Sequence, residues 1–473
     1  MRTPSAVLSA ATLAAALLAA APAVQAAPIT SVAADQQILD GPVFAGDTVA
    51  WAAGTRPQRL RAVVAGGAPR TLARTPAFPE GGEAFTFGLE GSPTRLAWGF
   101  GEGVAVDPDG YTTREQVVAG PPGGPLVRVA GDGADAVRAT AMDLDGDRLV
   151  TSEDIVAEGQ RPSSVLRGYD LAAGGDPTAL APQGSAELAT AGPYVAYRSA
   201  STTGGALARI VVADAATGTP VYGVDVPTVP PIGYGLRFDL QADGTLAVLT
   251  ANPAATGSDP VLDLAWASIA DPTLHVIVPD VTPFNLRIAA NRIVYGRELD
   301  RRSSRLFVAD LAGVGHPVTP VVDSVTGVDF DGTRLGWSTE GCVYAGDLPA
   351  AAVDALPGGR CAGQDYRLVT GTLNRRAARA LVRCVAGPAT GCAGTAKLTR
   401  AGGGPTLART TFTVGARKQT SIVLPLRPAV LRALQRSARR KKARFATLRI
   451  VTSVTDGAGN VNTRSIPATG RVR

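Results

Sequence analysis

The segment 143–147, Asp-Leu-Asp-Gly-Asp, contains the densest group of potential metal ligands in the sequence. Alternating aspartates are typical of calcium loops, in which carboxylate oxygens bind the ion. An EF-hand loop has glycine at its sixth position and glutamate at its twelfth, whereas this chain has Arg148 and Asp154 there. We therefore interpret the segment as a turn and keep its acids only as weak calcium candidates. These candidates are Asp143, Asp145 and Asp147.

Residues suited to nucleophilic or phosphate chemistry are scarce. Histidine occurs only as His275 and His316, neither of which has a neighbouring Cys or His. Both follow the end of an expected strand, so we interpret them as polar turn residues. The sequence contains no G-x-S-x-G motif and no G-x-x-x-x-G-K-[ST] phosphate loop. Gly99, Gly101 and Gly103 follow an apolar strand and open no helix, which indicates a hairpin. We assign no catalytic residue and no cofactor.

The four cysteines allow three disulfide pairings. We favour the local pairs, Cys342 with Cys361 and Cys384 with Cys392. Neither a C-x-x-C spacing nor a Cys/His cluster indicates zinc. Structural disulfides are typical of proteins in an oxidising, exported setting.

The N-terminal segment has the pattern of a secretory signal. Arg2 precedes an apolar, alanine-rich run over residues 6–21, and Val24-Gln25-Ala26 places small residues where a signal peptidase reads them. We expect cleavage after Ala26, which removes residues 1–26. The run is too short to span a membrane, and no later stretch approaches a transmembrane segment. We therefore expect a secreted, periplasmic or cell-envelope protein.

The charge is strongly uneven along the chain. Residues 366–473 contain 22 Lys and Arg but a single acid, Asp456, so this part carries +21 and the remainder −15. The densest run of Lys and Arg, within residues 436–444, has two interpretations. It is the solvated end of a helix, whose dipole favours cations, or it binds an anionic partner. That partner could be a cell-envelope polymer or the acidic part of this chain; nucleic acid does not fit an exported protein. The possible anion-binding residues are Arg436, Arg439, Arg440, Lys441, Lys442 and Arg444.

The acidic part is organised as seven copies of a short apolar strand, of which 331–337, Asp-Gly-Thr-Arg-Leu-Gly-Trp, is the clearest. The last core positions of the copies are Trp51, Trp98, Thr151, Tyr197, Val248, Tyr295 and Trp337. The mean step is about 48 residues, a period typical of repeat architectures. A second strand follows each core strand, and several end in Asp-Leu or Asp-Ala.

These repeats predict an all-β fold. The 55 Gly and 35 Pro residues indicate many tight turns, while 45% hydrophobic residues suffice for a core. A small antiparallel sheet cannot bury both faces alone, so the copies must stack around an axis. We predict a seven-bladed β-propeller, with six or eight blades as alternatives. Residues 28–43 should pair with the last blade to close the ring, and Trp337 should pack between blades.

The pattern Asp-Gly-x-x-apolar-apolar-aromatic, followed by apolar-x-x-Asp-Leu, resembles the repeat of TolB-like and other WD-type (WD40-like) propellers. Residues 331–348 and 291–311 match it best, and the resemblance covers most of 40–350. It implies the propeller fold. It implies no single function, because propellers host binding, scaffolding and enzymatic roles alike.

The basic part has a separate pattern. Apolar strands alternate with turns over 380–398, 410–426 and 446–463, and Pro428 opens a short helix with Val430, Leu431, Leu434 and Ala438 on one face. Five or six strands predict an immunoglobulin-like β-sandwich. Its Cys…Gly-Cys-x-Gly hairpin and Asp-x-x-Gly-Asn turn resemble the C-terminal modules of many exported actinobacterial proteins. We expect a propeller over 27–365 and a basic module over 366–473.

Our leading hypothesis is an exported, non-enzymatic binding or scaffold protein, monomeric, with a protein or a cell-envelope polymer as partner. A third hypothesis is a structural domain of a larger envelope assembly. The alternative is a lyase or hydrolase that uses carboxylates or tyrosines in the central channel. Paired acids with perturbed pKa values in the channel would favour the enzyme, and a channel of small apolar residues would favour binding.

Overall fold

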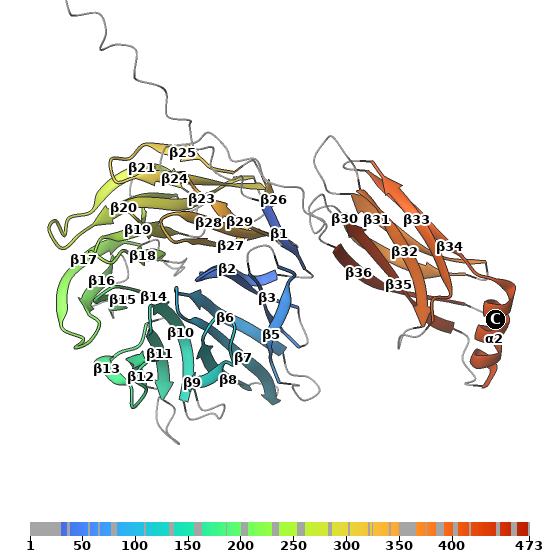
Figure 1. The fold of residues 1–473 in the computed structure, drawn as a ribbon, viewed down its shortest axis with the longest axis horizontal. Helices are drawn as coiled ribbons and strands as arrows, with labels where there is room; N and C mark the ends of the chain where they lie inside the picture. The colour runs from blue at the N-terminus through green and yellow to red at the C-terminus, as the bar shows by residue number, and fades with distance from the viewer. Residues whose placement is uncertain are drawn as a thin grey trace, which may run out of the picture.

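The computed structural model describes residues 30–35, 38–54, 57–64, 67–76, 83–107, 110–131, 137–155, 163–185, 187–199, 207–228, 236–252, 261–281, 286–300, 303–319, 322–323, 325–339, 342–349, 366–374, 376–384, 392–400, 405–415, 418–440, 445–455 and 461–471. Seven small antiparallel sheets, hereafter blades 1 to 7, are arranged in a ring (Figure 1). The predicted all-β, seven-bladed propeller is therefore confirmed. The predicted signal segment 1–26 and Cys361 lie outside the described residues.

Blades 1 to 3 each contain four strands in chain order from the innermost to the outermost. Blade 1 comprises β2 (Ile38–Ala45), β3 (Thr48–Ala53), β4 (Arg59–Val64) and β5 (Arg70–Arg74). Blade 2 comprises β6 (Glu83–Gly91), β7 (Leu96–Asp107), β8 (Gly110–Gly120) and β9 (Val127–Ala130). Blade 3 comprises β10 (Val137–Asp145), β11 (Arg148–Ile155), β12 (Ser163–Asp170) and β13 (Thr178–Ala181).

Blades 4 to 6 repeat this order, and in blade 6 an additional strand, β26 (Val322–Asp323), pairs with β24. Blade 4 comprises β14 (Leu188–Ala191), β15 (Tyr194–Ser199), β16 (Leu207–Asp214) and β17 (Pro220–Pro227). Blade 5 comprises β18 (Phe238–Leu240), β19 (Leu246–Ala251), β20 (Leu262–Ala267) and β21 (His275–Val281). Blade 6 comprises β22 (Arg287–Ala289), β23 (Arg292–Asp300), β24 (Ser303–Asp310) and β25 (Gly315–Pro317).

Blade 7 closes the ring with strands from both ends of the propeller. It comprises β27 (Val325–Phe330), β28 (Arg334–Thr339), β29 (Cys342–Asp347) and β1 (Thr30–Ala34). The N-terminal strand β1 runs antiparallel to β29, with Thr30 opposite Ala345. The predicted pairing of the N-terminal segment with the last blade is thus confirmed for β1, whereas β2 already belongs to blade 1. Cys342 is disulfide-bonded.

The apolar cores predicted from the repeats form the second strand of every blade. Their aromatic ends Trp51, Trp98 and Trp337 are all fully buried. Trp337 packs in one cluster with Val294 and Leu306 of blade 6, which confirms that it lies between blades. Burial of such large side chains between adjacent sheets is the main stabilisation that a single blade could not obtain alone.

Arginines at the first position of the second strand, or directly before it, connect neighbouring blades. Arg334 donates from Nη1 to the carbonyl oxygen of Gly46 in the first hairpin of blade 1, at 2.7 Å. Arg292 donates in the same way to Gly332 of blade 7, at 2.8 Å. The others are Arg148, which donates to Gly192 of blade 4, and Arg95, whose Nε lies 2.5 Å from Asp147 of blade 3. We call these four residues the inter-blade arginines.

The predicted hairpin at Gly99, Gly101 and Gly103 is wrong, because all three lie inside the long strand β7. A Cβ at Gly99 would lie 2.5 Å from the Phe87 ring, and one at Gly101 would lie 2.6 Å from the Phe85 ring. Glycine therefore leaves room here for the β6 side chains and does not form a turn.

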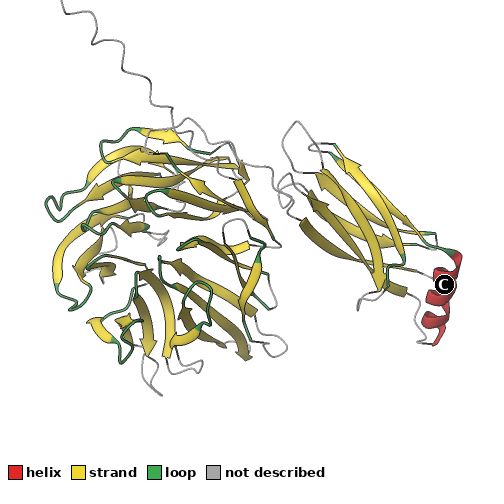
Figure 2. Ribbon diagram, viewed as in Figure 1, coloured by secondary structure: helices red, strands yellow, loops and turns green. Residues whose placement is uncertain are grey.

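The C-terminal residues form one seven-stranded sheet, with a helix packed against it (Figure 2). The sheet order is β33-β32-β35-β36-β30-β31-β34, and its edge strands β33 and β34 lie next to each other, so the sheet is nearly closed. Its elements are β30 (Tyr366–Leu373), β31 (Ala377–Cys384), β32 (Cys392–Arg400), β33 (Ala408–Val414), β34 (Gln419–Pro425), α2 (Pro428–Arg440), β35 (Phe445–Thr455) and β36 (Val461–Arg471). The immunoglobulin-like arrangement and the boundary at 366 remain predictions.

Local features of this sheet agree with the sequence. Cys384 and Cys392 form the predicted disulfide between β31 and β32. The helix begins at the predicted Pro428, and Val430, Leu431 and Leu434 pack against the buried core of the sheet. Among the described residues, no helix is long and apolar enough to cross a membrane.

Candidate ligand site in the central channel

The innermost strands of the seven blades surround a central channel, and one position recurs on each of them. In every blade this position pairs with the residue that precedes the last core position of the second strand. The seven equivalent residues are Val43, Glu90, Asp143, Ala189, Asp239, Arg287 and Asp329. We call them the channel ring. Four acids and one arginine therefore come together at one level of the channel.

Three of the ring acids connect one blade to the next. An innermost strand has no β partner on its channel side, so its backbone N–H groups there need other acceptors. In each case the carboxylate accepts a hydrogen bond from a backbone N–H in the next blade. The donor is the residue directly after the equivalent ring position of that blade. The pairs are Asp329 with Phe44 at 2.6 Å, Asp143 with Thr190, and Asp239 with Ile288 at 2.7 Å.

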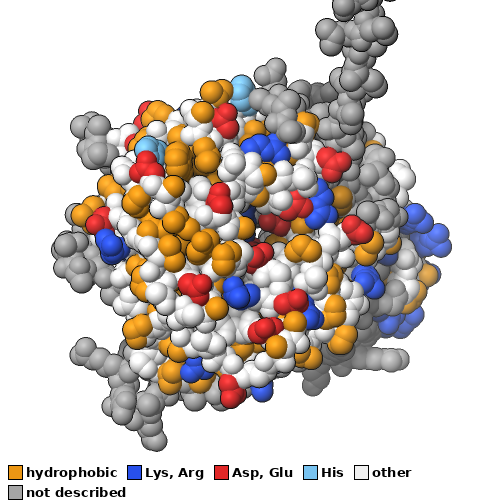
Figure 3. Space-filling model, turned by 60° about the vertical axis from the view of Figure 1, so that its left-hand side comes forward, with side chains coloured by type: hydrophobic (Ala, Val, Ile, Leu, Met, Phe, Trp, Pro, Cys, Tyr) orange, Lys and Arg blue, Asp and Glu red, His pale blue; other side chains and the backbone are white. Residues whose placement is uncertain are grey.

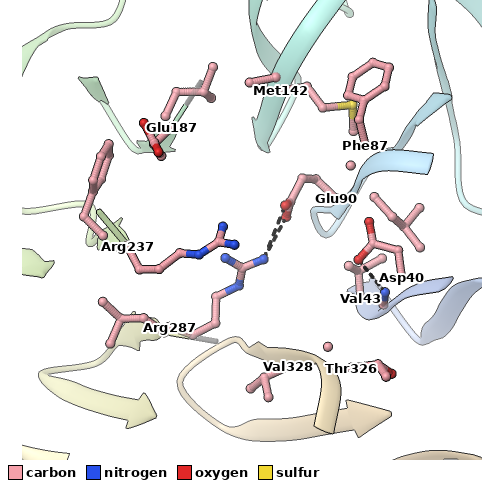
Figure 4. Close-up of a pocket in the computed structure, with 18 of the residues that line it drawn as sticks. Asp40, Val43, Phe87, Glu90, Met142, Glu187, Arg237, Arg287, Thr326 and Val328 are labelled. Atoms are coloured by element: carbon pink, nitrogen blue, oxygen red, sulfur yellow. Dashed lines mark hydrogen bonds and ion pairs between the residues drawn. The ribbon is translucent and has the colours of Figure 1, made fainter. Parts of the chain in front are cut away.

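Arg287 neutralises part of this negative charge. Its Nη2 lies 3.3 Å from both carboxylate oxygens of Glu90, which belongs to blade 2 on another side of the channel (Figure 4). Its Nε lies 3.7 Å from Oδ1 of Asp329 in the adjacent blade. The Glu90 carboxylate is the main cause that raises the pKa of the Arg287 guanidinium, so this residue stays charged.

Burial raises the pKa of every acid near this arginine. Desolvation raises the pKa of Asp143 to about 7 and that of Asp40, on the innermost strand of blade 1, to about 6. It also raises the pKa of Glu90 well above its ordinary range, and the pKa values of Asp239 and Asp329 in the same direction. The arginine opposes these shifts but does not cancel them, because one cation cannot compensate five neighbouring carboxylates.

A cavity of about 240 Å³ occupies the channel, and all seven blades contribute to its wall. Acidic side chains gather around a hollow in the middle of the face seen in Figure 3. The charged residues of the wall are Asp40, Glu90, Glu187, Arg237 and Arg287. Its larger apolar residues include Phe87, Met142, Leu236, Phe238 and Val328. The described lining residues include no His, Ser, Cys, Lys or Tyr.

The three calcium candidates have separate partners. Asp143 belongs to the channel ring, whereas Oδ2 of Asp145 accepts the Gly192 N–H at 2.6 Å. Asp147 forms the ion pair with Arg95. In the part of the chain that the structure describes, no group of three or more His, Cys, Asp or Glu side chains could hold a metal ion.

The histidines lie on the outermost strands β21 and β25, so their prediction as turn residues is wrong. His275 stacks on Trp266, with the ring centroids 4.6 Å apart, and its Nε2 lies 2.8 Å from Oδ2 of Asp271. His316 pairs with Val308 of β24. Both therefore lie at the periphery of the ring, away from the innermost strands.

The basic run at the end of α2 is only partly described. Arg436 is exposed on the helix, and the backbone of Arg439 and Arg440 completes its last turn. Lys441, Lys442 and Arg444 lie outside the described residues.

A basic surface that the sequence analysis missed lies on the outer face of the C-terminal sheet. Lys397 is opposite Arg409, and Arg449 is opposite Thr399 on the same face. Arg379 and Arg383 are exposed on β31, where buried and exposed residues alternate. We call Arg379, Arg383, Lys397, Arg409 and Arg449 the basic sheet face. The alternation in strand 377–384 could have revealed part of it.

The topology places the chain in the class of seven-bladed β-propellers, here followed by a basic C-terminal sheet. No family model matches the sequence, and no curated protein is significantly similar to it. Solved structures that are similar include a prolyl endopeptidase (TM-score 0.44, 15% identity), which covers 75% of this chain, while this chain spans only 54% of it. The β-propeller domain of the Trilobed protease from Pyrococcus furiosus (TM-score 0.42, 10% identity) covers 68% of this chain and 98% of its own length. The WD40 β-propeller domain of Doa1 (TM-score 0.36, 10% identity) covers 68% and 96%.

Proposed function

We propose that this protein is an exported, non-enzymatic binding protein. Its propeller is a rigid interaction surface, and its basic C-terminal module contacts an anionic polymer of the cell envelope. The observation that carries the proposal is the basic sheet face. The candidate signal segment 1–26 and the disulfide Cys384–Cys392 support an oxidising, exported setting.

The electrostatics of the module favour an external anion. Lys397 and Arg409 lie directly opposite each other on neighbouring strands, an arrangement in which like charges destabilise a sheet. The only acid of residues 366–473 is Asp456, so the module offers almost no internal counter-charge. A polyanion bound along this face would relieve the repulsion and release its own counterions. Hydroxyl groups on the same face, such as the hydrogen-bonded pair Ser453 and Thr463, add donors for a polymer.

Co-sedimentation with an immobilised polyanion, such as dextran sulfate, tests the proposal with the full mature chain. We expect binding that weakens with salt and that is absent for neutral dextran. The triple substitution of Lys397, Arg409 and Arg449 by Gln should weaken binding at least about tenfold, because each contact is electrostatic.

The matched control removes three exposed bases from blade 1 of the propeller. These are Arg59, Arg70 and Arg74, each replaced by Gln. This control should bind as the unchanged protein does. Equal loss in both triple variants, or binding that is insensitive to salt, would refute a specific role of the basic sheet face.

The alternative of an enzyme is favoured by one observation, the carboxylates with raised pKa values in the channel. Because the described lining lacks His, Ser, Cys, Lys and Tyr, such chemistry would depend on Asp40 and Glu90 as acid and base. Hydrolase and lyase substrates should be screened with the unchanged protein and with Glu90→Gln. Turnover that disappears in the variant would favour the enzyme over the binding protein.

A further inference from the structure

The cavity in the channel combines a charged side with an apolar side. Phe87 and Met142 lie on one wall, while Asp40, Glu90 and Arg287 project into the same space from blades 1, 2 and 6 (Figure 4). At about 240 Å³ it is smaller than the cavities of roughly 300–1,000 Å³ that hold drug-sized ligands. A ligand of this site must therefore be small and have both a polar and an apolar part.

The fixed charges determine which polar group fits. Five carboxylates, those of Asp40 and the four acidic ring residues, surround the single guanidinium of Arg287. Arg237 points toward Arg287 in the same space, and Glu187 also lines the cavity (Figure 4). These two residues add one charge of each sign, so the excess of carboxylates remains. Carboxylates therefore outnumber cations around the cavity. Backbone N–H groups donate hydrogen bonds to three of these acids, but they add no net positive charge.

We propose that this cavity binds a small organic cation, an amine or a guanidinium compound with a short apolar body. The cationic group lies between the carboxylates of Asp40 and Glu90, where it offsets the excess of negative charge. The apolar body packs against Phe87 and Met142, since an aromatic face and a thioether both suit a cation with a short alkyl chain.

Proton release provides a readout that a nonspecific contact would not give. The charged groups that face Asp40 are Arg287 and Glu90, and the Gly41 N–H donates to its Oδ1 at 2.7 Å. A cation bound there favours the ionised carboxylates, so it displaces the protons that burial retains. Binding should therefore tighten by about tenfold between about pH 5 and about pH 8, and calorimetry in two buffers should detect the released protons.

The test uses calorimetric titration of the full mature protein with 1,4-diaminobutane, agmatine and choline. We expect saturable binding of at least one of them. Asp40→Asn should weaken it about tenfold, because the variant removes one carboxylate next to the ligand. The matched control is Asp225→Asn on the outermost strand β17, where the acid pairs with Arg209 at the surface; it should leave binding unchanged.

A thermal melt of Asp40→Asn shows whether this variant is folded. The triple variant of the basic sheet face should retain amine binding, and this result separates the present proposal from the proposed function. The proposal is overturned if none of the three amines binds at millimolar concentration, or if Asp225→Asn loses as much affinity as Asp40→Asn. It is also overturned if calcium binds in their place, or if propionate binds and Arg237→Gln abolishes that binding.

Discussion

The side chains of Glu90 and Arg287 meet across the central channel although 197 residues separate them in the chain. Neither residue belongs to the repeated strand that defines the blades in the sequence. Their contact exists only because closure of the ring brings blades 2 and 6 to opposite sides of one narrow space. The channel is therefore held by long-range electrostatics in addition to packing between adjacent blades.

Substitution of Arg287 by Gln should destabilise the propeller by about 3 kcal/mol near neutral pH, because a half-buried set of carboxylates loses its cation. Chemical denaturation measures the change in the free energy of unfolding. The loss should shrink at about pH 5, where the acids with raised pKa values are protonated.

The control is Arg209→Gln, which removes an exposed ion pair with Asp225. It should change stability by at most about 0.5 kcal/mol. A loss for Arg287→Gln that is identical at both pH values would contradict the electrostatic explanation.

The stability of the unchanged protein should fall as the pH rises from about 4 to about 7. Aspartates of the unfolded chain ionise near 3.8, whereas folded Asp40 and Asp143 ionise at about 6 and about 7. Between these values the folded state binds more protons than the unfolded state, so their contribution is present at low pH and is lost as the pH rises. Melting temperatures across this range measure the effect.

Asp143→Asn should flatten this pH profile, since the amide oxygen can still accept the Thr190 N–H but carries no titrating proton. We expect a gain of about 2 kcal/mol at pH 7 relative to the unchanged protein. Acids with lowered pKa values, such as Asp170 and Asp331, lose their contribution only at lower pH. If the stability of the unchanged protein rose between about pH 4 and about pH 7, the predicted pH profile would be refuted.

The blades could be predicted because their signals are local. A short apolar run marks each second strand, and in three copies an Asp-Gly turn precedes it. Trp337 is buried as its pattern indicated. The closing strand β1 could be predicted because a propeller requires its ends to meet. The prediction of a hairpin at Gly99 was wrong, because glycine occurs both in turns and where another side chain packs closely against a strand. At Gly99 the Phe87 ring occupies the space that a Cβ would need.

The channel ring was missed although its spacing is present in the sequence. Glu90, Asp143, Arg287 and Asp329 each lie eight residues before the last core position of their copy. Within one copy such a residue looks like a solvent-exposed charged residue before the core strand. Its burial and its partner depend on the other blades, so only an alignment of the seven copies with one another could have indicated it.

Arg334→Gln should weaken the junction between blade 7 and blade 1. The Arg334 guanidinium donates to the Gly46 carbonyl at 2.7 Å and lies over the Phe44 ring at 4.3 Å. We expect a loss of about 1–2 kcal/mol, typical of a lost charge-assisted hydrogen bond. Hydrogen exchange should accelerate in β2 and β28, whereas the exposed control Arg74→Gln should leave exchange unchanged; equal protection in both variants would contradict a role in closure.

Replacement of both Cys384 and Cys392 by Ser should destabilise the C-terminal module by about 2.5 kcal/mol, as expected for a short disulfide-closed loop. Both cysteines are fully buried and only eight positions apart, so their loss removes the covalent link between β31 and β32, which are not neighbours in the sheet. Calorimetry should resolve two unfolding transitions, of which only the one assigned to the basic module moves to lower temperature. If the propeller transition moved by the same amount, the two parts would unfold as one unit, and the division near residue 366 would be wrong.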